Sequence, residues 1–317
     1  MARGKANAIL KVLDYLKDPD ARMMDYQDLS QVPDVPQTPL LRPEAARGQP
    51  AALDSLLVPE NAERLEQIAL DGAERGGREW YNLDPLRKAF IEELGDEEGA
   101  AAFNKYVDYV AATSPRSKVA GNIRRSSHFY QLDRNGQQVA GLTNADMPKG
   151  YGHIAHDTHD HKLREIEEHG GLLPMNGPKV SSFAENLKGN QSPMTIDTHN
   201  YSAVRNEPDV KKSPTNPQYR YLEDFQAEIA EKLDMTPAQF QASVWIAGDT
   251  GVADARPFID AFDDVLKRTA EKNGVTRDQA LKDFINGKAP LFGLAALMSG
   301  LQLAEGGPSD GLLVPEA

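Results

Sequence analysis

The stretch LPMNGPKVSSFAENL, residues 173–187, places a turn and a helix start in the middle of the chain. Gly177, with a proline three residues before it, favours a tight turn, and Pro178 suits the first position of a helix, where its missing N–H costs no hydrogen bond. Apolar side chains then recur at helical spacing, at Val180, Phe183 and Leu187. Because a charged helix precedes it and stops at Gly170 and Gly171, the pattern predicts helix, hairpin and helix.

Such a hairpin leaves backbone N–H groups unpaired at the start of its second helix, where they can bind a phosphate without reading base sequence. Lys179 is the second residue of that predicted helix. Asp197 follows 18 residues later, in the string TIDTHN at 195–200. We expect these two side chains to belong to one site.

Outward from this stretch, the chain from about residue 61 onward is predicted to be helical. Asp84 is a candidate helix cap before Pro85, and Thr236 before Pro237, while glycines such as Gly95 close the predicted helices. No segment alternates polar and apolar residues as a half-buried strand would. The sequence therefore predicts an all-α fold.

A basic segment, ATSPRSKVAGNIRRSSHFY at 112–130, precedes the hairpin. Between residues 109 and 132 there are four basic side chains and no acidic one, although the whole chain has a net charge of −13. One interpretation is a helix entry that faces phosphates, and the other is a solvated helix face. The basic residues are Arg116, Lys118, Arg124 and Arg125.

Five of the seven histidines lie within residues 153–169. On a helix, His153 and His156 would share one face with Asp157 and Asp160, a spacing that a metal could use. No spacing in the segment matches a zinc template, and the alternative is a polar helix that faces substrate or solvent. The sequence therefore predicts no metal site.

Bulk composition bounds the class of protein. The chain has 317 residues, of which 40% are hydrophobic and 26% charged, as in a soluble globular protein. There is no cysteine, which excludes disulfides, thiolate metal sites and a cysteine nucleophile. No apolar run is long enough for a membrane span, and the first 22 residues lack the unbroken apolar core of a secretion signal. We expect a cytoplasmic protein, or a virion-associated one if a phage encodes it.

A short motif, Leu-Leu-x-Pro-Glu, occurs three times and suggests a protein partner. A leucine pair beside a rigid proline can fill an apolar pocket at low ordering cost, and three copies would add avidity. The alternative is chance, with Pro59 marking a helix start. The copies are LLRPEA (Leu40 to Ala45), LLVPEN (Leu56 to Asn61) and LLVPEA (Leu312 to Ala317).

At this point a family resemblance appears. LPMNGPK resembles the Leu-Pro-x-x-Gly-x-Lys hairpin of the helix-hairpin-helix DNA glycosylases, the superfamily of the endonuclease III and 8-oxoguanine enzymes. IDTH is similar to that family's Val-Asp-Thr-His, at a similar interval after the lysine, and the basic segment resembles the helix that lines the family's DNA groove. The resemblance covers roughly residues 80–204.

The resemblance implies that Lys179 is an amine nucleophile that forms a Schiff base with the sugar, and that Asp197 supports departure of a flipped-out base. It implies no cofactor, although the hairpin is a place where a monovalent cation could bind. The implied partner is DNA. Its expected contacts are Arg116, Lys118, Asn122, Arg124, Arg125, Gly177 and Ser181, with a base pocket that could include His153, His156 and His199.

The expected organisation is a helix and Pro-rich arm over 1–61, a glycosylase-like domain over 62–210, and C-terminal accessory helices with a tail over 211–317. Two functions remain open from the sequence. The first is a DNA glycosylase with abasic-site lyase activity on a modified or damaged base. The second is a phage virion or assembly protein that keeps a glycosylase-like fold and docks through its Leu-Leu-x-Pro-Glu repeats.

Overall fold

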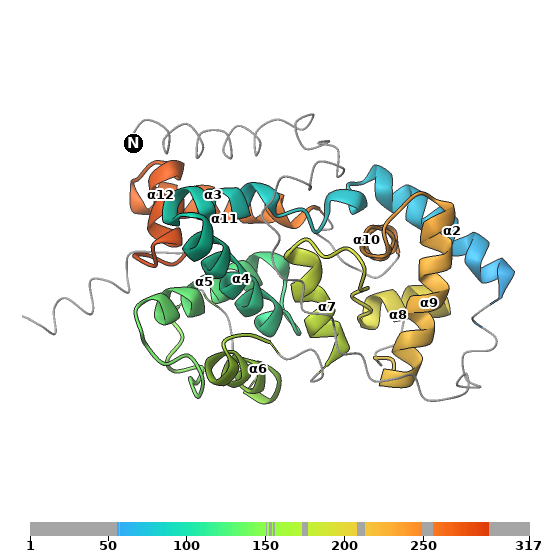
Figure 1. Ribbon diagram of the computed structural model, residues 1–317, viewed down its shortest axis with the longest axis horizontal. Coiled ribbons are helices and arrows are strands. Elements are labelled where there is room, and N and C mark those ends of the chain that lie inside the picture. The colour runs from blue at the N-terminus through green and yellow to red at the C-terminus, as the bar shows by residue number, and fades with distance from the viewer. Residues whose placement is uncertain are drawn as a thin grey trace, which may run out of the picture.

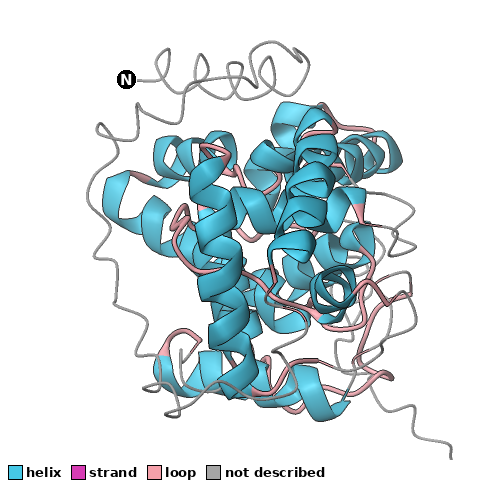
Figure 2. Ribbon diagram, turned by 90° about the vertical axis from the view of Figure 1, so that its right-hand side faces the viewer, coloured by secondary structure: helices cyan, strands magenta, loops and turns pink. Residues whose placement is uncertain are grey.

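The computed structural model describes residues 56, 58–149, 151, 154, 156–172, 177–207, 213–248 and 256–291. Every regular element in these ranges is a helix (Figure 2), so the predicted all-α class is confirmed. None of the helices described here is both long and apolar enough to cross a membrane. The predicted N-terminal helix, the Pro-rich arm and the C-terminal tail lie outside the described residues.

The helices follow one another along the chain with short connections. They are α2 (Pro59–Glu74), the 3-10 helix η4 (Gly77–Glu79), α3 (Asp84–Leu94), α4 (Asp96–Thr113), α5 (Val119–Arg134), α6 (His156–His169), α7 (Pro178–Leu187), α8 (Thr198–Arg205), α9 (Asn216–Lys232), α10 (Pro237–Ala247), α11 (Phe258–Asn273) and α12 (Arg277–Ile285).

The predicted helix starts and ends are mostly confirmed. Thr236 caps α10, where its hydroxyl accepts a hydrogen bond from the Gln239 backbone N–H at 3.2 Å. The prediction that Asp84 caps α3 is wrong by one residue, because Asp84 is itself helical. The Asp84 backbone N–H donates a hydrogen bond to the side-chain oxygen of Asn82, at 3.1 Å.

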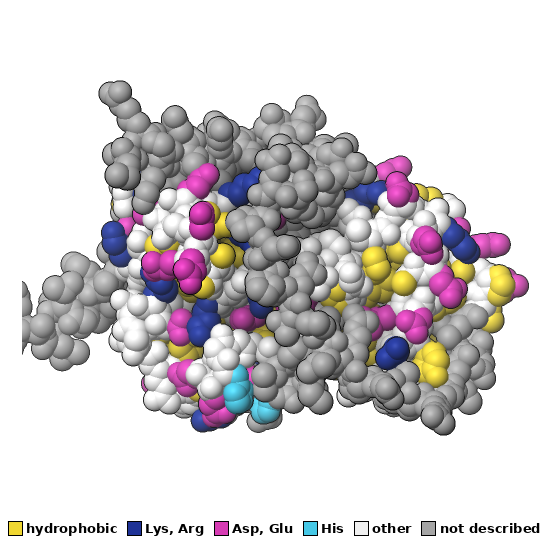
Figure 3. Space-filling model, in the orientation of Figure 1, with side chains coloured by type: hydrophobic (Ala, Val, Ile, Leu, Met, Phe, Trp, Pro, Cys, Tyr) yellow, Lys and Arg dark blue, Asp and Glu magenta, His cyan; other side chains and the backbone are white. Residues whose placement is uncertain are grey.

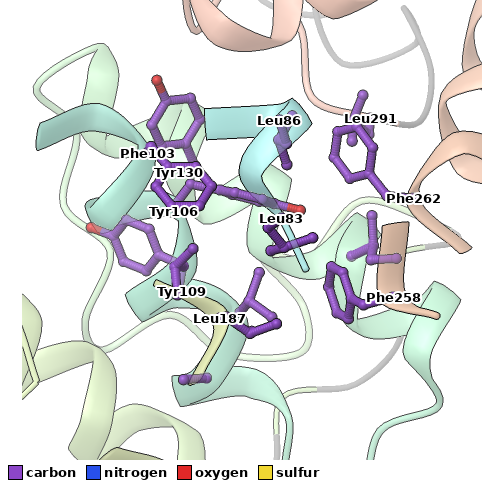
Figure 4. Packing of buried hydrophobic residues seen from close by; sticks show 14 of the residues in the cluster. Leu83, Leu86, Phe103, Tyr106, Tyr109, Tyr130, Leu187, Phe258, Phe262 and Leu291 are labelled. Carbon is purple, nitrogen blue, oxygen red and sulfur yellow. The ribbon is translucent and has the colours of Figure 1, made fainter. Parts of the chain in front are cut away.

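The larger hydrophobic core lies among α3, α4, α5, α7, α11 and α12, on the left of Figure 1. Its centre is aromatic: Tyr106, Tyr130 and Phe284 are fully buried and their rings lie within 6 Å of one another, mostly edge to face. Leu187 brings the end of α7 into the same core (Figure 4). The apolar face of α4, which includes Phe103 and Val110, is buried here.

A second core lies on the right of Figure 1, where α2, α8, α9 and the outer face of α10 meet. Helix α10 belongs to both cores: Ala238 and Ala242 pack into the first, and Phe240 and Val244 into the second. A helix that is apolar on all sides must be buried on all sides, and α10 satisfies this by lying between the two halves.

The two halves do not follow the order of the chain. Helix α2, at the start of the described residues, packs with α8, α9 and α10, while α11 and α12 pack back onto α3 and α5. The sequence suggested that the helices after residue 211 form a separate accessory bundle. These contacts show that they do not. Each half is completed by helices from both sides of α7, which lies between the halves (Figure 1).

The contact between α2 and α10 depends on the absence of a side chain at Gly72. A Cβ atom at this position would lie 1.9 Å from the Ser243 backbone oxygen. At Gly121, in α5, a Cβ atom would meet nothing within 4 Å.

We therefore expect Gly72→Ala to destabilise the protein by roughly 1–3 kcal/mol, because the backbones of α2 and α10 must separate. Gly121→Ala is the matched control and should stabilise by up to about 1 kcal/mol through helix propensity. Urea unfolding of both variants measures the difference. Equal stability of the two variants would contradict the close packing of α2 on α10.

Candidate active site

Helix α7 begins where the sequence predicted. Its N-cap, Gly177, has φ 135° and ψ 99°, a conformation that L side chains rarely adopt, and Pro178 is the first helical residue. Residues 173–176 of the hairpin lie outside the described residues. Lys179 is the second residue of α7, and the predicted apolar face of Val180, Phe183 and Leu187 packs against the first core.

Helix α8 begins at Thr198, with Asp197 as its N-cap. The Asp197 Oδ1 accepts a hydrogen bond from the backbone N–H of Asn200 at 2.8 Å. Asn200 is fully buried and exchanges amide hydrogen bonds with Gln226 of α9, at 3.0 and 3.2 Å. The carboxylate of Asp197 is therefore held at a fixed helix end, and its second oxygen is not used by the cap.

The segment between the two helices is held by buried side chains. The Asn186 amide of α7 donates to the carbonyls of Asn190 and Pro193, at 2.9 and 2.8 Å, and accepts from the Thr195 hydroxyl at 2.8 Å. Tyr219 of α9 donates to the Met194 carbonyl and accepts from the Ile196 N–H. These bonds fix the position of Asp197 relative to α7.

Lys179 lies partly buried at the junction of the two halves. Its Nζ lies 3.4 Å from the Ser114 hydroxyl at the end of α4 and 5.8 Å from the centre of the Phe183 ring. Burial lowers the pKa of Lys179, and the charge of Asp197 opposes that shift. The two residues that the sequence paired are thus close enough for the charge of one to act on the other.

Tyr81 is a buried tyrosine near Thr195 and Asp197. The sequence did not mark it as part of the candidate site. Its hydroxyl donates to the Gln241 side chain at 2.6 Å. Burial raises the pKa of Tyr81, a hydrogen bond with Thr195 opposes this, and the Asp197 charge raises it further. Tyr81 is therefore neutral and lies beside the segment that carries Asp197. Through Gln241 it is also bonded to α10, the helix that packs into both cores.

The structure assigns different roles to the predicted DNA contacts. Arg116 and Lys118 are exposed on the connection between α4 and α5. Arg124 is partly buried, and burial together with the positive charge of Arg268 lowers its pKa. Asn122 is buried, with its amide bonded to Val110 and Thr113, so it holds the connection rather than facing solvent.

Arg125, like Asn122, is buried and bonded to the α4–α5 connection. Ser181 is buried in α7, whereas Gly177 is partly exposed at its start. Ser114 was not singled out, and nothing in its sequence context distinguishes it, because only the fold brings it to Lys179. Trp80, Tyr81, Phe129 and Tyr130 are all buried in the first core.

The predicted base pocket is only partly placed. His153 lies outside the described residues, and of His156 the structure gives only its position at the start of α6. His199 is exposed in the first turn of α8. Exposed histidines gather at the lower edge of the molecule, over α6 (Figure 3). Among the described residues, no group of three or more His, Asp or Glu side chains could hold a metal ion.

One copy of the Leu-Leu-x-Pro-Glu motif, at 56–61, is described apart from residue 57. Leu56 packs against the second core, its carbonyl accepts a hydrogen bond from the Asn61 side chain at 2.7 Å, and Pro59 begins α2. This copy therefore serves as a helix start docked on its own chain. The copies at 40–45 and 312–317 lie outside the described residues.

Comparison with known proteins places this fold in a family. Residues 60–252, more than half of the chain, match DUF7178, a family of unknown function, and the chain belongs to that family. The matched region runs from α2 through α10 and includes both Lys179 and Asp197. No curated protein and no solved structure matches the chain.

Burial of the Lys179 amine should make this side chain unfavourable for stability. Since its folded-state pKa lies below the unfolded value, the cost is complete below the folded pKa and disappears as pH rises towards about 10.5. We expect Lys179→Met to raise the melting temperature at pH 7, and the gain to shrink between pH 7 and pH 10.5.

Lys188→Met is the matched control, since Lys188 is the C-cap of α7 and its amine pairs with the buried carboxylate of Asp108 at 2.6 Å. Its loss leaves Asp108 buried and unpaired, and should lower the melting temperature. A destabilised Lys179→Met at neutral pH would show that Lys179 is a structural residue.

Proposed function

We propose that the protein is a DNA glycosylase with abasic-site lyase activity, in which Lys179 is the nucleophile and Asp197 assists departure of the base. The observation that carries this proposal is the partly buried Lys179 amine, with a lowered pKa, under the influence of the Asp197 carboxylate. The sequence resemblance to helix-hairpin-helix glycosylases supplies the reaction. The contact of the Lys179 amine with Ser114 and the capping position of Asp197 at the start of α8 also support it.

A lysine nucleophile has to lose its proton before it can attack. Removal from water favours the neutral amine, and the contact with the Phe183 ring keeps one side of the amine apolar. The Ser114 hydroxyl also donates to the Ala111 carbonyl at 3.0 Å, so towards Lys179 it acts as an acceptor. One N–H of the Lys179 amine then points at Ser114. The lone pair of the neutral amine therefore points away from Ser114.

In the proposed reaction the lone pair of the Lys179 Nζ attacks C1′ of a nucleotide that has been flipped out of the duplex. The bond from C1′ to the base breaks, and the base leaves with the electron pair and takes up a proton. The nitrogen then loses a proton, and as its lone pair forms the C=N bond of the Schiff base, the bond from C1′ to the ring oxygen breaks and that oxygen takes up a proton. Removal of a proton from C2′ then breaks the bond between C3′ and the phosphate oxygen.

Asp197 would act on the charge that develops during the first step. As the base departs, positive charge grows on the sugar, and a fixed carboxylate beside it lowers the energy of that state. The N-cap bond to Asn200 and the bonds of Asn186 and Tyr219 keep the carboxylate from moving. Asp197 therefore needs no reorganisation during the reaction.

The test is to incubate the protein with duplex DNA that contains an abasic site, in the presence of borohydride. A Schiff base is reduced to a stable covalent adduct, which we expect for the wild type, while Lys179→Ala should lose it completely. Lys188→Arg is the control, because it removes a lysine amine at the end of α7 but keeps a cation for the buried carboxylate of Asp108, and it should still be trapped. If no abasic substrate gives an adduct, or if Lys179→Ala still does, the proposed nucleophile is wrong.

Asp197 can be separated from its capping role by two variants. Asp197→Asn keeps an N-cap acceptor and removes the charge, so stability should change little while base release slows by about 100-fold or more, as for loss of an electrostatic group. Asp197→Ala should also lose about 1 kcal/mol of stability. Borohydride trapping on a preformed abasic site needs no departure of a base. Both Asp197 variants should therefore lose much less trapping than base release. Unchanged base release by Asp197→Asn would remove Asp197 from the mechanism.

A further inference from the structure

The connection between α4 and α5, residues 114–118, is held from three sides by buried side chains. The Asn122 amide donates to the Val110 carbonyl at 2.9 Å. Arg125 Nη1 donates to the Thr113 carbonyl at 3.2 Å and to the Ser117 hydroxyl. From α6, the His159 Nε2 bonds the Pro115 carbonyl at 2.9 Å. The connection is thus a rigid loop, although it lies at the surface.

Arg125 is the unusual member of this arrangement because it is a buried cation without a carboxylate partner. The residue is 6% exposed, and the two groups that accept its hydrogen bonds are a neutral carbonyl and a neutral hydroxyl. Within the part of the chain that the structure describes, its Nε has no hydrogen-bond partner and no acidic group pairs with it. Buried charges are normally paired, so the described surroundings of Arg125 lack the anion that a buried guanidinium needs.

Arg116 adds a second positive charge on the same loop. It is exposed, and its φ of 59° puts a side-chain-bearing residue in the left-handed region, which costs on the order of 1 kcal/mol. The charges of Arg125 and Arg116 both act on the His159 ring, and burial with these charges lowers the pKa of His159. The loop therefore concentrates two guanidinium groups and keeps the adjacent imidazole neutral.

The start of α5 contributes a third favourable feature. Its N-cap is Lys118, which makes no side-chain capping bond, and its first turn contains no acidic residue. The N–H groups of this 16-residue helix are thus not capped by a side chain, and the helix dipole is positive at this end. All three features favour an anion with several acceptor oxygens.

We propose that the 114–118 loop and the start of α5 form a binding site for a phosphate group, held by Arg125 and Arg116. Since Ser114 of the same loop contacts the Lys179 amine, the site lies next to the proposed nucleophile. That the phosphate belongs to DNA rests on the proposed function. The other source of the same chemistry is free inorganic phosphate.

The site itself is tested by thermal unfolding of the full chain in inorganic phosphate against sodium chloride of equal ionic strength. We expect phosphate to raise the melting temperature of the wild type, and the increase to be smaller in Arg116→Gln. Arg75→Gln is the matched control, because Arg75 is an exposed arginine of the other half that pairs with Asp71. No increase over chloride, or the same increase in Arg116→Gln as in the wild type, would overturn the proposal.

Arg125→Lys provides the second variant, since it keeps the charge but removes the guanidinium Nη1 that bonds both Thr113 and Ser117. It should lower stability without phosphate and reduce the phosphate-dependent increase as well. If Arg125→Lys unfolds, Arg116→Gln still decides the outcome, because Arg116 is exposed and makes no contact that the fold requires.

The source of the phosphate is decided with duplexes that carry an abasic-site analogue and one uncharged methylphosphonate at a time. In the wild type, one position near the analogue should weaken binding. In Arg116→Gln that position should no longer matter, and the slope of log affinity against log salt should fall by about one. The control Arg75→Gln should behave as the wild type.

The outcomes separate this inference from the proposed function. Stabilisation by phosphate without any binding to DNA would support the site, assign it to free phosphate and reject the glycosylase proposal. Borohydride trapping through Lys179, combined with no effect of phosphate or of Arg116→Gln, would reject the site and leave the glycosylase proposal standing.

Discussion

The buried amide of Asn186 is the interaction on which the geometry of the candidate site depends. It joins α7, which carries Lys179, to the segment 190–195, which leads to Asp197. All of its hydrogen-bonding capacity towards this segment is used, and the side chain is fully buried. Because an unsatisfied buried amide or carbonyl costs about 1–3 kcal/mol, this segment has one favourable position relative to α7.

This constraint operates at the boundary between two hydrophobic cores. Lys179 reaches Ser114 of the first half, whereas Asp197 caps a helix of the second half. Helix α10 packs into both cores and holds the halves together. The geometry of the candidate site therefore depends on how the two halves are held together. We expect a change in the packing of α2 on α10 to alter the position of Lys179 relative to Asp197.

The electrostatic arrangement at the junction favours reactivity over stability. A partly buried lysine, a buried arginine without a carboxylate partner among the described residues, and an arginine with left-handed backbone geometry all cost free energy. They lie close together, around Ser114, in a chain whose net charge is −13. Unfavourable features of this kind tend to concentrate where a protein binds a ligand or carries out chemistry.

Local sequence determined the helices and their ends. Proline at the first position of α2, α7 and α10, the capping box of Thr236 and Gln239, and the glycines after α3 and α6 are short-range signals that act through the backbone of the same few residues. The spacing of Lys179 and Asp197 was also visible, because both residues stand at helix starts separated by one short helix and a loop.

Only the tertiary structure decided which helices share a core and which side chains lie around Lys179 and around the segment that leads to Asp197. Ser114, Tyr81 and Tyr219 come from three different helices or connections, and no local pattern marks them. Contacts between residues far apart in the chain also bring α11 and α12 back onto α3 and α5. Such contacts bury Arg125 and Asn122 in a segment that looked like an exposed basic face. Helix periodicity tells which face of a helix is apolar, but the choice of partner depends on shape and on hydrogen bonds between residues far apart in the chain.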